Sequence, residues 1–145
     1  NLANAHIKLE HYKQAVYYFR LAAQSYTYAV GDEETIEVGL CNNSLGTAYL
    51  SMKKYDSALI FYNISYQYFK GYPKDQYANL VPVSTNYAEV CSQMGDHKTI
   101  QSIAEFMLPT IAENEGKETA NYYDMLTRYG VCMRDQQHKK TKTKI

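Results

Sequence analysis

The sequence predicts an all-α chain of stacked antiparallel helix pairs, an α-solenoid. Three observations predict it: a repeat of about 42 residues, apolar side chains at helical spacing, and the lack of any alternating strand pattern. The 145 residues are 46% hydrophobic and 21% charged, which supplies enough apolar side chains for a core and argues against intrinsic disorder. We therefore expect a folded repeat domain.

The repeat is carried by four slots: a small residue, a ring, a second ring and a second small residue. The first two copies, 43 residues apart, fill these slots with Ala3, His6, Tyr12, Ala15 and with Gly46, Tyr49, Tyr55, Ala58. A third copy follows 42 residues later as Ala88, Cys91, His97 and Ile100, and a weaker fourth copy contains Leu126 and Tyr129. These offsets predict repeats at about 1–31, 32–73, 74–116 and, in part, 117–133.

Each copy is expected to form two helices. In the second copy one helical stripe ends at Met52, the turn Lys53-Lys54 interrupts it, and another stripe begins at Tyr55. In the first copy the corresponding turn would contain His11. Further helix ends are predicted at Gly31-Asp32, Gly71-Tyr72-Pro73, Gly95-Asp96 and Gly116. Pro109 is expected to kink or shorten its helix.

The small slots have a mechanical explanation. Where the two helices of a pair cross closely, a large side chain would push the backbones apart, so Gly46 and Ala58 are expected to face one another. Replacing Gly46 with Leu should therefore force the second pair apart. Because one pair cannot bury both of its faces, successive pairs are expected to stack and to leave a concave groove.

These slots resemble the tetratricopeptide repeat. The resemblance is carried by Leu45-Gly46-x-x-Tyr49, Tyr55-x-x-Ala58 and Tyr62, and by Asn1-Leu2-Ala3 and Asn86-Tyr87-Ala88, which are similar to the Asn-Leu-Ala variant. It covers nearly the whole chain and is strongest over residues 1–108. It implies a right-handed α-solenoid that binds a protein or peptide. The period exceeds the family's usual length of about 34 residues and is similar to that of kinesin light chains and of the bacterial Rap, PlcR and NprR peptide receptors.

The resemblance also implies that the first helix of each pair lines the groove. The residues on these helices that lie off the apolar stripe are Asn1, Asn4, Lys8, Asn43, Thr47, Leu50, Ser51, Thr85, Asn86, Glu89, Gln93, Tyr123 and Thr127. An Asn amide offers an extended peptide backbone both a donor and an acceptor. In peptide-binding members of the family the Asn of the Asn-Leu-Ala slot has this role, which carries over to Asn1 and Asn86. The alternative interpretation is a solvated helix face.

We expect a non-catalytic scaffold that binds a protein or peptide. The sequence contains no glycine-rich phosphate loop, nucleophile elbow, HExxH or paired-carboxylate motif, so no enzyme activity, cofactor or metal is expected. One alternative is a peptide-sensing regulatory module of a bacterial signalling protein or transcription regulator. Another is a self-association module, which would make the chain a homodimer.

The net charge of zero conceals an uneven distribution. From Arg134 onward the chain has five basic residues and one acidic residue, which leaves ten basic and fourteen acidic residues before it. We expect the basic tail 134–145 to begin a truncated helix or to be disordered and solvated, and we expect this segment to contact no nucleic acid. No apolar run approaches the roughly 18 residues of a membrane span, so no span is expected.

Cysteine and histidine residues are expected to be structural. Three widely spaced cysteines predict buried free thiols in a reducing compartment, and hence a cytoplasmic location. His6, Glu10 and His11 crowd one turn, but His6 occupies a ring slot, so packing is preferred over metal binding. Much of the excess of 16 tyrosines falls in the repeat slots. A start at Asn1 without a signal-peptide pattern suggests a piece of a longer protein.

Overall fold

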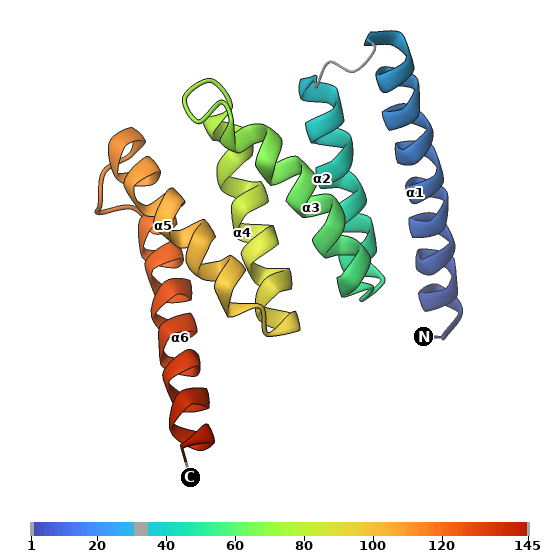
Figure 1. Cartoon of the computed structure of the whole chain (residues 1–145). Helices are drawn as coiled ribbons and strands as arrows, with labels where there is room; N and C mark the ends of the chain where they lie inside the picture. Colours follow the sequence, from blue (N-terminus) through green and yellow to red (C-terminus); the bar gives the residue numbers. More distant parts are fainter. Residues whose placement is uncertain (1, 31–34, 145) are drawn as a thin grey trace. The chain divides into compact units, whose positions relative to one another are not determined.

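The computed structural model describes residues 2–30 and 35–144, without the side chains of residues 2–7, 27, 29 and 30. Over these residues every regular element is a helix, which confirms the all-α prediction for the described part of the chain (Figure 1). The helices are α1 (Leu2–Val30), α2 (Ile36–Ser51), α3 (Tyr55–Lys70), α4 (Tyr77–Met94), α5 (His97–Asn114) and α6 (Ala120–Thr143). The chain divides into two compact units, Asn1–Tyr72 and Pro73–Ile145. This division coincides with the predicted end of the second repeat.

In the first unit, α2 and α3 form an antiparallel hairpin that turns where the sequence predicts (Figure 1). Lys53 adopts a left-handed backbone conformation with φ of 57°. The amide of Lys54 donates a hydrogen bond to the carbonyl oxygen of Tyr49 at 2.9 Å. A left-handed residue at this point satisfies the carbonyl groups at the end of a helix and reverses the chain.

The two helices of this hairpin approach closely at Gly46 because an aromatic ring covers it. A Cβ atom at Gly46 would lie 2.7 Å from the ring of Tyr62, whose side chain is fully buried. The predicted small slot is therefore used, although its nearest atoms belong to Tyr62 rather than to Ala58. About two turns earlier on α2, Gly39 lies against the ring of Tyr68 in the same way. The carbonyl oxygen of Gly39 accepts a 2.7 Å hydrogen bond from the Ser65 hydroxyl.

The first helix, α1, is continuous, so the predicted turn at His11 is wrong. The two hairpin turns contain Lys53 and Gly95, which hold corresponding repeat positions and have φ of 57° and 70°. The corresponding residue of the first copy is Glu10, which continues the helix. No glycine or proline interrupts residues 2–30, so local sequence does not oppose one long helix. The predicted boundary at Gly31-Asp32 lies outside the described residues.

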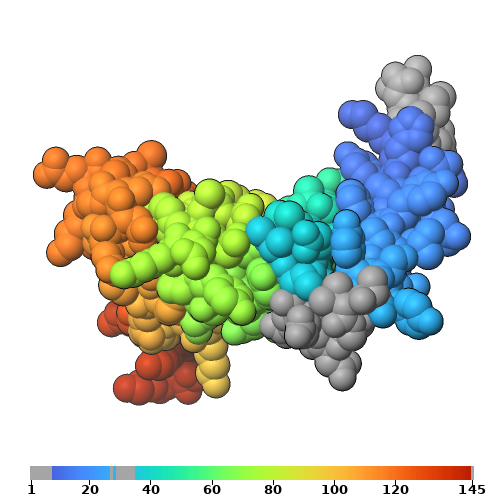
Figure 2. Space-filling model, turned by 90° about the horizontal axis from the view of Figure 1, so that it is seen from above, coloured from blue at the N-terminus to red at the C-terminus, as the bar shows by residue number. Residues whose placement is uncertain are grey.

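A cation–π contact holds α1 against the α2–α3 hairpin. The rings of Tyr49 and Phe61 stack with centroids 5.4 Å apart and an interplanar angle of 4°. The guanidinium carbon of Arg20 lies 6.0 Å from the first centroid and 5.7 Å from the second. Arg20 thus joins all three helices of this unit. Part of the α1 surface, which is blue in Figure 2, stays uncovered in that view.

In the second unit, α4 and α5 form a hairpin whose turn at Gly95-Asp96 is also as predicted. The Asp96 carboxylate accepts hydrogen bonds from the amide and hydroxyl groups of Thr99, at 3.2 and 2.6 Å, and so caps α5. The apolar core of the hairpin contains Leu80, Val83, Val90, Ile103, Met107 and Ile111. Pro109 does not shorten α5, which continues to Asn114.

The last helix, α6, packs along α5 and is held at its start by a carboxylate. Glu115 accepts hydrogen bonds from the Tyr77 hydroxyl at 2.7 Å and from the Asn121 amide at 2.9 Å, which links α4 to the start of α6. The Thr119 side chain caps α6. Because α6 begins at Ala120 and extends to Thr143, the Lys-rich tail continues this helix rather than beginning one of its own.

The close approach at Gly46 is testable with two matched substitutions. We expect Gly46→Ala to lower the free energy of unfolding by about 1–3 kcal/mol, because the new Cβ would collide with the Tyr62 ring. We expect Gly130→Ala on α6, where a Cβ meets no atom within 4 Å, to raise it by up to about 1 kcal/mol. Urea unfolding measures both values, and equal effects of the two substitutions would contradict the packing described for Gly46.

Candidate functional site

A surface pocket lies between α1 and α2 in the first unit, and we call it the α1–α2 pocket. Its volume is about 290 Å³. It is lined by Tyr12, Ala15 and Phe19 from α1 and by Asn43, Ser44, Thr47, Ala48 and Ser51 from α2. The α1 wall is apolar and carries two rings, whereas the α2 wall is mostly polar. Three predicted binding residues, Asn43, Thr47 and Ser51, are gathered here.

The polar groups of this wall differ in how they are satisfied. The Thr47 hydroxyl donates to the carbonyl oxygen of Asn43 at 3.0 Å, so the Tyr62 hydroxyl, 2.9 Å away, must donate to it. The Ser51 hydroxyl donates to the carbonyl oxygen of Thr47 at 3.0 Å. By contrast, Oδ1 of Asn43 is buried and has no hydrogen-bond partner. A buried acceptor without a partner costs about 1–3 kcal/mol, so satisfying this amide oxygen would be favourable.

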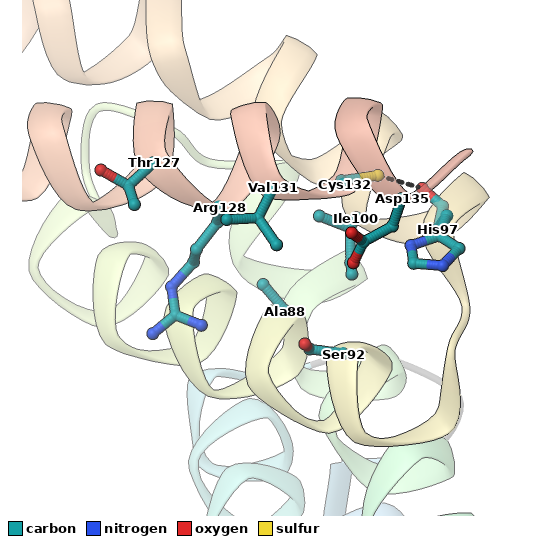
Figure 3. Close-up of a pocket in the computed structure, with 9 residues that line it drawn as sticks. All are labelled: Ala88, Ser92, His97, Ile100, Thr127, Arg128, Val131, Cys132 and Asp135. Atoms are coloured by element: carbon teal, nitrogen blue, oxygen red, sulfur yellow. Dashed lines mark hydrogen bonds between the residues drawn. The ribbon is translucent and has the colours of Figure 1, made fainter. Parts of the chain in front are cut away.

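A second pocket, the α4–α6 pocket, lies within the second unit and has a volume of about 190 Å³. Figure 3 shows its lining: Ala88 and Ser92 from α4, His97 and Ile100 from α5, and Thr127, Arg128, Val131, Cys132 and Asp135 from α6. The residues of α6 recur at spacings of three and four, so they share one face of the helix. In Figure 3, Arg128 and Thr127 lie at one end, and Asp135 and His97 lie at the other.

The Arg128 end of this pocket is neutralised by acidic residues. The Arg128 guanidinium forms ion pairs with Glu89 of α4 at 2.8 Å and with Asp124 of α6 at 2.9 Å. Hydrogen bonds from Arg128 and from Gln93 lower the pKa of Glu89 below its usual value. Glu89, a predicted groove residue, thus joins α4 to α6.

The opposite end of the pocket is acidic and contains an unused ring nitrogen. Nδ1 of His97 is buried and has no hydrogen-bond partner, while its backbone carbonyl accepts a hydrogen bond from the Cys132 thiol at 3.1 Å. Burial raises the pKa of Cys132, and the carboxylates of Asp135 and Asp96 raise it further. Two negative charges therefore act on this wall of the pocket.

Most of the remaining predicted groove residues that the structure describes line neither pocket. Asn1 lies outside the described residues, and the side chain of Asn4 is not described. The others lie on helix surfaces: Lys8 and Gln93 are exposed on α1 and α4, Leu50, Thr85 and Asn86 are half-buried on α2 and α4, and Tyr123 is exposed on α6. Thr127 lines the α4–α6 pocket.

Sequence reasoning missed the pocket residues that come from neighbouring helices. Phe19 and Arg128 belong to no repeat slot, and Asp135 was assigned to the tail. Tyr12 and His97 were recognised as ring slots, yet they were assigned to packing alone. The signal that could have found them is their shared repeat slot, which lines a pocket in both units.

The cysteines are free thiols, as predicted, and two of them are buried: Cys91 and Cys132. Burial and the charge of Asp96 raise the pKa of Cys91 to about 12, which keeps it protonated and unreactive. Cys41 is half-buried, and its pKa is also raised, by burial and by Glu37. Within the described residues, no three His, Cys, Asp or Glu side chains are grouped to hold a metal ion. His6 lies among the side chains that are not described, and Glu10 and His11 are exposed on α1.

No protein-family model, curated protein or solved structure matches this chain. Over the residues that the structure describes, no helix combines the length and apolar character that crossing a bilayer requires. The two pockets therefore provide the observations that bear on function. The α1–α2 pocket contains three predicted binding residues and a buried acceptor without a partner, which makes it the stronger candidate site.

The ion pair between α4 and α6 should be visible as a pH dependence of stability. Because the pKa of Glu89 is lower in the folded chain, its stabilisation is present above the unfolded pKa and is lost as the pH falls through the folded pKa. We expect Glu89→Gln to reduce the loss of stability between pH 7 and pH 3 by at most about 1 kcal/mol, since the side chain is 44% exposed. Urea unfolding at both pH values measures this, with the exposed Glu113→Gln as control. Identical pH dependence in the two variants would refute the role of Glu89.

Proposed function

We propose that the chain is a non-catalytic module that binds an extended peptide segment of a protein partner in the α1–α2 pocket. The observation that carries this proposal is the buried Oδ1 of Asn43, an acceptor without a partner in the wall of a surface pocket. The backbone amide of an extended peptide is a donor of the right kind. Binding would satisfy an acceptor that is otherwise left unpaired.

The apolar wall of the same pocket would accept a side chain of that peptide. Phe19 and Tyr12 face the polar α2 residues across the pocket, so an extended segment would contact a polar row on one side and rings on the other. Pockets that combine apolar lining with a few fixed polar groups are typical ligand sites. The Thr47 hydroxyl is held by Tyr62 and by its own helix, so it would be presented without a further loss of side-chain entropy.

Membership of the tetratricopeptide family and a right-handed solenoid are part of this proposal. Two helix hairpins turn at corresponding positions, Lys53 and Gly95, and a small slot is used for close packing at Gly46. These features support a repeat of helix pairs. The polar residues of α2 and α4 would then lie on the ligand-binding side of each pair.

The proposal is tested by selecting peptides from a displayed random library against the intact chain. For the selected peptides, we expect Asn43→Ala to weaken binding about tenfold, the effect of losing one well-formed hydrogen bond. The thermal midpoint should stay equal or rise, because no hydrogen bond of the folded chain is lost. The control is Asn63→Ala on the exposed surface of α3. Unchanged affinity in Asn43→Ala would overturn the assignment.

A second candidate function, self-association, is favoured by the exposed aromatic surface of α1. Tyr17, Tyr18 and Tyr28 are 63%, 65% and 94% exposed, and Leu21 between them is 48% exposed. Three of these residues, Tyr17, Leu21 and Tyr28, recur at spacings of four and seven and so share one side of the helix. Apolar surface gathered in this way marks an interaction site more often than scattered single residues do.

Sedimentation equilibrium over a range of concentrations tests this second candidate. We expect a self-associating chain to gain mass with concentration and the double variant Tyr17→Ser, Leu21→Ser to remain monomeric. The control is Tyr123→Ser, which removes an equally exposed ring from α6. A strictly monomeric parent chain would eliminate self-association and leave the peptide-binding proposal intact.

A further inference from the structure

The α4–α6 pocket combines an apolar middle with a polar, acidic end. Methyl-bearing side chains of three helices form the middle: Ala88, Ile100 and Val131. At the end, His97 and Asp135 bring an imidazole and a carboxylate, and Ser92 of α4 adds a hydroxyl to the lining (Figure 3). An occupant must therefore be apolar along its length and polar at one tip.

The charges around the pocket decide the sign of the charge at the polar tip of the occupant. Arg128 is already matched by Glu89 and Asp124, so its positive charge is compensated. Among the described residues, Asp135 forms an ion pair with the neighbouring Arg134, and both side chains are exposed to solvent, at 39% and 64%. Such exposed ion pairs contribute little to stability, so another cation can replace Arg134 as the partner of Asp135. Because Asp96 also acts on this end of the pocket, the tip should be positively charged.

The size of the pocket limits the occupant to one slender group. Its volume of about 190 Å³ is below the range of roughly 300–1,000 Å³ that is typical of sites for drug-sized ligands. Along α6 it extends from Thr127 to Asp135, a rise of about 12 Å at 1.5 Å per residue. A single unbranched side chain fits these dimensions, whereas a helix or a fused ring system does not.

We propose that the α4–α6 pocket binds a lysine side chain of a protein partner. The methylene stem would lie over Ala88, Ile100 and Val131, and the ammonium group would be held at Asp135, His97 and Ser92. This inference rests on the proposed function only in that the lysine belongs to a protein partner, and it requires no contact of that partner with the α1–α2 pocket.

The chemistry of the acceptors favours an ammonium over a guanidinium. An ammonium has three donors and no acceptor, and this end offers the Asp135 carboxylate, the unpartnered Nδ1 of His97 and the Ser92 hydroxyl. A guanidinium prefers to bind both oxygens of a carboxylate side by side. The acceptors here belong to separate side chains instead, which suits the three donors of an ammonium. A flexible amphipathic stem with a charged tip is also what the apolar middle requires.

The intact chain can be titrated with N-acetyl-lysine-N-methylamide while the methyl signals of Ala88, Ile100 and Val131 are followed by NMR. The matched probe is N-acetyl-norleucine-N-methylamide, which has the same unbranched stem without the ammonium. We expect saturable shifts of the three methyl signals with the lysine probe and about tenfold weaker binding of the norleucine probe. Binding of both probes with equal affinity would overturn the assignment of a cation, and no shift of these signals would overturn the pocket as a site.

Two variants test the acidic end separately. We expect Asp135→Asn to abolish the preference for lysine, and Glu113→Gln, which removes an exposed charge outside the pocket, to retain it. A retained preference in Asp135→Asn would overturn the inference, and far-UV circular dichroism checks that this variant is folded. Because the probes contain one residue, they do not depend on Asn43. Success of the peptide selection with failure here would reject only the lysine site, and the reverse result would reject only the α1–α2 site.

Discussion

The contact between Gly46 and the ring of Tyr62 is the constraint on which the first unit depends. A buried ring lies where any other residue would place its Cβ, so α2 and α3 approach more closely than ordinary side chains allow. The same ring donates its hydroxyl proton to Thr47. Packing between the helices thus orients the polar wall of the α1–α2 pocket, and the fold and the candidate site share one interaction.

In the second unit, polar contacts at the edges add to the apolar core of the hairpin. Glu115 joins the starts of α4 and α6, and Arg128 joins the same two helices further along through Glu89. Ile100 occupies the slot that Ala58 occupies in the preceding copy, and it lines the α4–α6 pocket rather than a close helix crossing. Contacts at the edges hold the helices in place while a space remains between them, which is why this unit contains a small pocket with charged ends.

Much of the fold could be predicted from the spacing of residues, and the site could be predicted only in part. Turns at Lys53 and Gly95 follow from breaks in helical stripes, and they are confirmed. The turn expected at His11 is wrong: the position that turns at Lys53 and at Gly95 continues as helix in the first copy, where residues 2–30 contain no glycine or proline. Asn43, Thr47 and Ser51 were placed on one face by helical period, which made their meeting in one pocket predictable.

The sequence by itself determined that the chain is helical, where its hairpins turn, which small residue allows close packing, and that its cysteines are free. These properties depend on the spacing of residues along the chain and on the type of side chain at single positions. Tertiary structure alone decided which amide is left without a partner and which charges face one another. Asn43 and His97 are unpartnered, and Arg128 is matched twice, because of how other helices pack around them. Hydrogen bonds and ion pairs require distances of about 3 Å between groups far apart in the chain, and no sequence spacing specifies such distances.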